Sequence, residues 1–313
     1  MKKMLSLAAM FAVLSYAAPA SAELKIGGEA AVRARAEFND TTGDDLLYQY
    51  RIRLNTSADL GDGYFFKAMM QNEEVPSAWT TMIGGPAAPY SGLNNREKYA
   101  MEISNFYFGR NLKDCSYSIG RLPLNSFNNP IFDLALYAVP TVLSATSTVY
   151  AVDIPVTTYN FDRLFGANYS RKIGDGTFNG TLVVMDNSST KATDNGFLND
   201  GYALHLGYKT TVGDVTVEPQ ALLSLTNIDL AKNDVSPQTI GVNATIPSGK
   251  AKVGVSAFYT ICDDTTPANA DVDYTGYLVR LKGESGNAMA WIDYNATSDQ
   301  SGANDADYDN LFV

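Results

Sequence analysis

The sequence is poor in the residues that enzymes commonly use for acid–base and nucleophilic chemistry. Its 313 residues hold one histidine, His205, and two cysteines, Cys115 and Cys262. Charged residues make up 18% of the chain, which is below the share of a soluble globular protein. Lys and Arg number 23 against 34 Asp and Glu, so nucleic acid is excluded as a partner because binding it needs a basic footprint. After the N-terminal segment, no apolar run is long enough for a membrane-spanning helix.

The N-terminus has the three parts of an export signal. A basic start at Met1–Lys3 is followed by an uncharged apolar run, Met4–Tyr16, and by small residues before Glu23. A membrane anchor is not expected, because the run is short and ends in a cleavage site. We therefore predict a removed signal peptide over residues 1–22 and a mature chain over 23–313. The mature chain has 21 basic and 34 acidic residues, a net charge of −13.

The mature chain opens with strict alternation. Leu24, Ile26 and Val32 belong to an apolar set, whereas Glu29 and Arg33 belong to the intervening polar set. A period of two predicts an extended strand with one apolar and one polar face.

The same pattern recurs along the chain, and short Gly/Asp/Asn-rich turns alternate with long polar connections. This sorting of connections by length predicts hairpins whose tight turns gather at one end, as in an outer-membrane barrel. A soluble sandwich has no reason to sort its loops in this way. The predicted strands are fourteen: 24–38, 48–59, 64–72, 97–110, 115–122, 161–173, 177–186, 201–211, 215–226, 237–246, 250–261, 272–282, 288–297 and 307–313. We therefore predict an all-β fold, a transmembrane antiparallel β-barrel with long extracellular loops and short periplasmic turns.

The arginines decide which face of this barrel meets lipid. An arginine on the lipid side costs about 2–4 kcal/mol near the bilayer midplane, and a dry core would be worse for a cluster of charges. We therefore expect the apolar set to face lipid and the polar set to face a wet interior. The inward arginines are Arg33, Arg35, Arg51 and Arg53.

The remaining reactive residues predict no chemistry. Cys115 lies beside a short turn and Cys262 begins a long loop, so they should sit at opposite ends of a wall about 25 Å high and remain free thiols. His205 falls on the polar set of its strand, with no nucleophile beside it in the sequence, so we expect a solvated histidine on the interior face. The acidic run Asp305–Asn310 lacks the turn glycine of a calcium loop. We expect no catalytic residue, no metal site and no cofactor, and loop acids that bridge lipopolysaccharide through divalent ions.

One stretch resembles the general porins of Gram-negative bacteria. "ISNFYFGRNLKDCSYSIGRL", residues 103–122, looks like the paired strands before the constriction loop of those proteins, and "SIGRL" supplies the matching Arg121. Residues 123–160 would then be the inward loop, and "FDRLFGANYS" the strand that resumes the barrel. The resemblance implies a passive, commonly trimeric channel in which wall arginines oppose loop acids. Carried over, the basic wall is Arg33, Arg35, Arg51, Arg53 and Arg121, and the acids are Asp133, Asp153 and Asp162; the alternative is that these acids face solvent.

The C-terminus departs from that pattern. General porins end in an aromatic residue, whereas this chain stops at Val313. Either the sequence is a truncated product or its closing strand is short. A missing segment, or a hairpin within residues 131–156, would raise the strand count from fourteen to sixteen.

The sequence therefore predicts a porin in the outer membrane of a Gram-negative bacterium. Its expected partners are the bilayer, lipopolysaccharide, small hydrophilic solutes and ions, and two further copies of itself. A substrate-specific channel is an alternative in the same class, with Phe65 and Phe106 as candidate interior aromatics. An outer-membrane enzyme using His205 and an adhesin with a closed interior are alternatives of other classes.

Overall fold

A computed structural model describes the parts of the chain that carry the predicted strands. The described residues are 23–37, 45–72, 80–81, 101–124, 129–132, 141–142, 149–150, 163–186, 200–226, 228–230, 233–265, 271–300 and 305–312. The predicted signal peptide, residues 1–22, lies outside them. No helix among the residues just given is both long and apolar enough to cross a membrane.

The chain forms two compact units. The N-terminal unit covers residues 1–74 and 79–120, and the C-terminal unit covers 75–78 and 121–313. In the N-terminal unit the strands β1, β2, β3, β5 and β6 succeed one another in chain order, and the short β4 pairs with β2. Their bounds are β1 Glu23–Glu37, β2 Asp45–Gly61, β3 Tyr64–Gln71, β4 Thr80–Thr81, β5 Glu102–Asn111 and β6 Cys115–Pro123.

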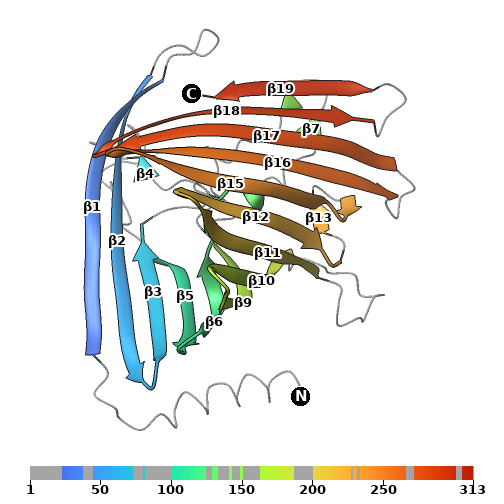
Figure 1. Ribbon diagram of the computed structural model, residues 1–313. Helices are drawn as coiled ribbons and strands as arrows, with labels where there is room; N and C mark the ends of the chain where they lie inside the picture. Colours follow the sequence, from blue (N-terminus) through green and yellow to red (C-terminus); the bar gives the residue numbers. More distant parts are fainter. Residues whose placement is uncertain are drawn as a thin grey trace, which may run out of the picture. The chain divides into compact units, whose positions relative to one another are not determined.

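The C-terminal unit continues with nine strands, again hydrogen-bonded in chain order (Figure 1). Every recorded pairing within it is antiparallel. The strands are β9 Arg163–Ile173, β10 Gly176–Asp186, β11 Gly201–Val212, β12 Val215–Ser224, β15 Gln238–Ser248, β16 Ala251–Thr265, β17 Asp271–Ser285, β18 Ala288–Asp299 and β19 Ala306–Phe312.

Two small strand pairs stand apart from these series. β7 Thr141–Val142 pairs with β8 Val149–Tyr150, and β13 Ile228–Leu230 pairs with β14 Asn233–Val235. Of residues 131–156, where a hairpin was considered, the described part holds β7 and β8, which form a two-stranded sheet of their own. The fourteen predicted strands each have a counterpart in the two units, and the all-β prediction is confirmed.

Four of the tight turns share one design. Gly174, Gly213, Gly249 and Gly286 each stand first in a two-residue loop, with φ between 57° and 61°. The second residue of each loop is not among the described non-glycine residues with positive φ. Glycine with positive φ at the first loop position is the signature of the type II′ turn, whose twist matches that of the strands it joins. The turn glycines therefore set the hairpins, as the sequence pattern indicated.

Alternate residues on a strand differ sharply in exposure. On β17, Tyr277, Val279 and Leu281 are exposed, whereas Tyr274 and Leu278, on the alternate face of the strand, are fully buried. On β1 the exposed set begins with Leu24, Ile26 and Val32. The apolar set is thus exposed on both units, which agrees with the orientation inferred from the sequence.

The buried face of the C-terminal unit has a compact apolar cluster. Ile131 and Phe132, which precede the strands of this unit in the sequence, pack there and are almost completely buried. The rest of the cluster is supplied by the strands: Val183, Met185, Ala203, Leu222, Phe258 and Leu278. Ile131 and Phe132 therefore cover part of the face that lies opposite the exposed apolar set.

Candidate functional site

The register of β1 on β2 gathers the predicted arginines on one face of the N-terminal unit. Arg53 lies opposite Glu29, and Ala31 lies opposite Arg51. One step further along the strands, Arg33 lies opposite Gln49 and Arg35 opposite Leu47. Directly opposed residues of an antiparallel pair point to the same side of the sheet, so four arginine positions and Glu29 share this face. We call it the charged face.

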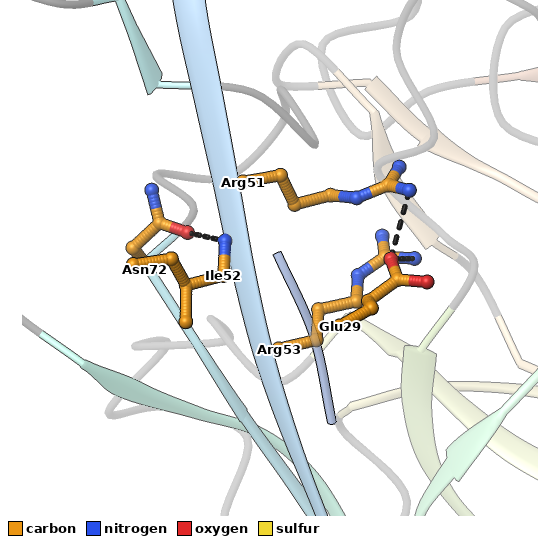
Figure 2. Close-up of polar contacts among 5 residues, drawn as sticks. All are labelled: Glu29, Arg51, Ile52, Arg53 and Asn72. Carbon is orange, nitrogen blue, oxygen red and sulfur yellow. Dashed lines mark hydrogen bonds and ion pairs between the residues drawn. The ribbon is translucent and has the colours of Figure 1, made fainter. Parts of the chain in front are cut away.

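Glu29 is bonded to both neighbouring arginines. Its Oε1 atom lies 2.8 Å from Arg51 Nη2 and 3.4 Å from Arg53 Nη1, and Figure 2 shows the carboxylate between the two guanidinium groups. The arginine side chains are 22% and 24% exposed, and that of Glu29 is 47% exposed. The group is therefore charge-paired and still in contact with solvent.

Sequence reasoning did not single out Glu29. It noted the residue only as a member of the polar set and placed all candidate acids in the later connections. The signal lies in the register of the hairpin, which brings residue 29 opposite residue 53 and so places unlike charges together; neither strand shows it alone. Cross-strand pairs of opposite charge stabilise a sheet modestly.

A side-chain amide closes β3 onto β2 beside these arginines. Asn72 Oδ1 accepts a hydrogen bond from the backbone N–H of Ile52, which lies between Arg51 and Arg53 (Figure 2). The backbone N–H of Asn72 in turn donates to the Ile52 carbonyl at 3.3 Å. Asn72 is buried. It thereby holds the segment of β2 that carries Arg51 and Arg53 on the side that faces β3.

The charged face continues onto β3 and β5 with aromatic residues. Phe65 and Tyr107 meet edge-to-face at 6.2 Å between ring centroids, and Lys67 Nζ lies 5.5 Å from the centroid of Phe65. Phe106 was a candidate interior aromatic, and that interpretation is wrong. The register pairs Tyr107 with Lys67 and Phe106 with Ala68, so Phe106 points to the opposite, exposed face.

The other residues predicted for the eyelet are Arg121 and three acids. Arg121 lies in β6, at the start of the C-terminal unit, and is partly buried. Asp133, Asp153 and Asp162 lie outside the described residues. The opposition of wall arginines and loop acids therefore stays a prediction.

The C-terminal unit presents a different polar face, centred on His205. His205 Nε2 lies 2.8 Å from Gln220 Oε1, and the imidazole meets the Phe132 ring at 5.1 Å between centroids. Asn129 Nδ2 donates to the same Gln220 oxygen at 2.7 Å, and Asn129 Oδ1 accepts from Asn243 Nδ2 at 3.2 Å. His205 is buried, so the expectation of a solvated histidine is wrong. It helps to hold residues 129–132 against the strands.

A buried ion pair lies on the same face. Arg280 Nε donates to Asp293 Oδ1 at 2.6 Å, and Arg280 Nη2 donates to Asp293 Oδ2 at 2.8 Å. The two side chains are 3% and 0% exposed. Two parallel charge-assisted bonds make this the geometry in which arginine binds carboxylate most specifically. The pair joins β17 to β18.

The two cysteines are the remaining reactive groups singled out by the sequence. Cys115 and Cys262 are both free thiols, and Cys262 Sγ donates to Asp264 Oδ2 at 3.3 Å. Within the described ranges, no three or more His, Cys, Asp or Glu side chains gather into a group that could hold a metal ion.

Comparison with solved structures shows the same fold in outer-membrane proteins. The chain is similar to OmpT of Vibrio cholerae with loop L8 deleted, at a TM-score of 0.55 and 13% identity, over 93% of this chain and 86% of that one. It is also similar to outer-membrane expressed OmpT of Vibrio cholerae, at a TM-score of 0.52 and 11% identity, over 94% and 81% of the two chains. These likenesses, together with the antiparallel strand order, indicate a transmembrane β-barrel.

No curated protein matches the sequence. The family model described as Gram-negative porin matches residues 6–313, which is nearly the whole chain. The match includes both units and agrees with the two-faced strands and type II′ hairpins. This chain belongs to the Gram-negative porin family.

Proposed function

We propose that this chain forms a water-filled channel in the outer membrane for passive diffusion of small hydrophilic solutes and ions. The observation that carries the proposal is the charged face of the N-terminal unit. Arg51 and Arg53 keep contact with solvent on the side opposite the exposed apolar residues of β1 and β2. Charges so placed need water beside them, because the lipid side would cost about 2–4 kcal/mol for each arginine.

The channel works by size exclusion and by the field of its wall charges. Residues 129–132 pack on the polar face of the C-terminal unit through Asn129 and Phe132, which supports an inward loop over about 123–160. The proposed eyelet sets Arg33, Arg35, Arg51, Arg53 and Arg121 against Asp133, Asp153 and Asp162. Charged rings of this kind select ions by sign. The wall arginines give the channel a slight preference for anions.

The chain acts without chemistry in this proposal. His205 is occupied by Gln220 and Phe132, so a catalytic use of it would require this packing to open. The mature protein begins at Glu23 after signal cleavage, assembles as a homotrimer, and binds lipopolysaccharide through its acidic loops.

Planar bilayer recording of the refolded mature protein tests the channel. We expect steps of steady conductance, and a reversal potential in a potassium chloride gradient that reports a weak anion preference. A folded, heat-modifiable barrel that conducts no ions would overturn the proposal.

A substrate-specific channel is a second candidate, favoured by the aromatic pair on the charged face. Phe65 and Tyr107 lie beside Lys67, so an apolar ring and a cation are offered together to a passing solute. Such a channel would show current block that saturates with solute concentration. Conductance that rises in proportion to concentration for every solute tested would exclude the substrate-specific channel and favour the general channel.

A further inference from the structure

The charged face carries an acid of its own beside the arginines. Arg51 and Arg53 both contact the carboxylate of Glu29. The acids expected to balance the wall come from residues 123–162, whereas Glu29 stands within the wall itself on β1. A change at Glu29 therefore alters the field of the wall without altering any connection between strands.

The geometry makes Glu29 a competitor of passing anions. One oxygen, Oε1, contacts a nitrogen of each guanidinium group. This place between two guanidinium groups is where a solute carboxylate or phosphate would also be bound, because arginine recognises both groups through paired N–H donors. Glu29 is 47% exposed, so solvent and small ions reach it.

We propose that Glu29 is a specificity-determining residue of the channel. It occupies the anion position between Arg51 and Arg53, lowers the positive potential of the wall, and keeps the anion preference weak. The inference rests on the proposed channel function and deepens it. It assigns the solute class that the wall would retain without Glu29, namely small carboxylates and phosphates.

The position of β2 supports a local effect. Asn72 holds the backbone of Ile52, between the two arginines, so loss of the Glu29 charge leaves their Cα positions in place. The substitution then changes the charge beside the two guanidinium groups and not the path of the strand.

The test compares Glu29→Gln with the wild-type channel in a potassium chloride gradient. Removing one negative charge from the solvent-accessible charged face should raise the anion-to-cation permeability ratio about two- to five-fold at low salt. The difference shrinks as the salt concentration rises, because ions screen the wall. Sodium phosphate added to one side should also reduce the variant's chloride current more than that of the wild type.

Glu284→Gln is the matched control. Glu284 also forms an ion pair, at 2.8 Å from Lys282 Nζ, and it stands at the turn end of β17. The substitution removes the same charge from a strand end, so the permeability ratio should stay close to that of the wild type. Glu29→Asp keeps the charge and should do the same.

The double variant E29Q/R51Q provides an independent check. It removes one charge of each sign, so its permeability ratio should return towards the wild-type value. It also tests the inference if Glu29→Gln alone does not fold. A conducting Glu29→Gln channel with unchanged selectivity, or a double variant no different from the single one, would overturn the inference. Absence of conductance in the folded wild-type protein would instead overturn the channel itself.

Discussion

The two units use their polar faces in different ways, although the same alternation produces both. In the N-terminal unit, Arg51 and Arg53 share Glu29 and all three side chains remain partly exposed. In the C-terminal unit, Arg280 and Asp293 form an ion pair that is sealed from solvent. Burying an ion pair costs more in desolvation than placing it in water. The comparison shows that a polar face serves either as a solvent-exposed surface or as a surface against which other segments pack.

The difference follows from what covers each face. Ile131 and Phe132 lie on the C-terminal unit, where they join the apolar cluster with Leu222 and Leu278. Around them, Gln220 Oε1 accepts from Asn129 Nδ2 and lies 2.8 Å from His205 Nε2. Polar groups under such cover depend on partners within the protein, whereas the half-exposed carboxylate of Glu29 also meets water.

Removing Asp293 is the strongest way to break the comparison. Asp293→Ala leaves the Arg280 charge buried without its carboxylate, so we expect the free energy of unfolding to fall by about 3–5 kcal/mol. Urea titration of the refolded protein in lipid vesicles, followed by gel mobility, measures the change. Glu284→Ala in the exposed pair with Lys282 is the control and should change stability little.

Replacing the pair as a unit sharpens this prediction. The double variant R280M/D293L exchanges the ions for apolar side chains and should recover most of the lost stability. If Asp293→Ala were as stable as the wild type, the pair would not be sealed from solvent and the contrast between the two faces would disappear.

Truncation of Phe132 should have the next largest effect. Phe132 is 2% exposed, and Phe132→Ala removes its contacts with His205 and the apolar cluster, at a cost of about 3 kcal/mol. We expect residues 129–132 to detach and the single-channel current to become noisier. Leu225→Ala, at a residue that is 53% exposed, is the matched control. If Phe132→Ala had the same current noise and the same stability as this control, the packing described for Phe132 would be contradicted.

Loss of the His205 hydrogen bond should have the smallest effect. His205→Phe keeps a ring against Phe132 and removes the bond to Gln220, whose oxygen still accepts from Asn129. We expect a loss of about 1 kcal/mol in the free energy of unfolding and an unchanged conductance. Complete loss of conductance in a folded variant would show that His205 does more than hold this segment.

The sequence predicted the strands better than the contacts. Alternation of residues such as Leu24 and Ile26, with turn glycines such as Gly174 and Gly213, was sufficient to place fourteen strands, because both signals are local. The position of Phe106 was missed because a register shift between Met69 and Met70 changes which residues of β5 share the charged face. Such an irregularity leaves no mark in the alternation of a single strand.

The site contacts were beyond local pattern for a similar reason. Glu29 meets Arg53 across 24 residues, and Asn129 meets Gln220 across 91. These pairs depend on which strands are neighbours and on the register of each strand pair. The kind of residue was visible in the sequence, but its partner was not.

The chain-order pairing described for β15 to β19 also bears on how the protein folds. Each strand from β16 to β19 is bonded to the strand just before it in the sequence, and two of the connections are two-residue turns. Closing so short a loop costs little entropy, and a hairpin of this kind forms in about 1–10 μs. The barrel can therefore grow by one hairpin at a time, with each new edge serving as the template for the strand that follows it.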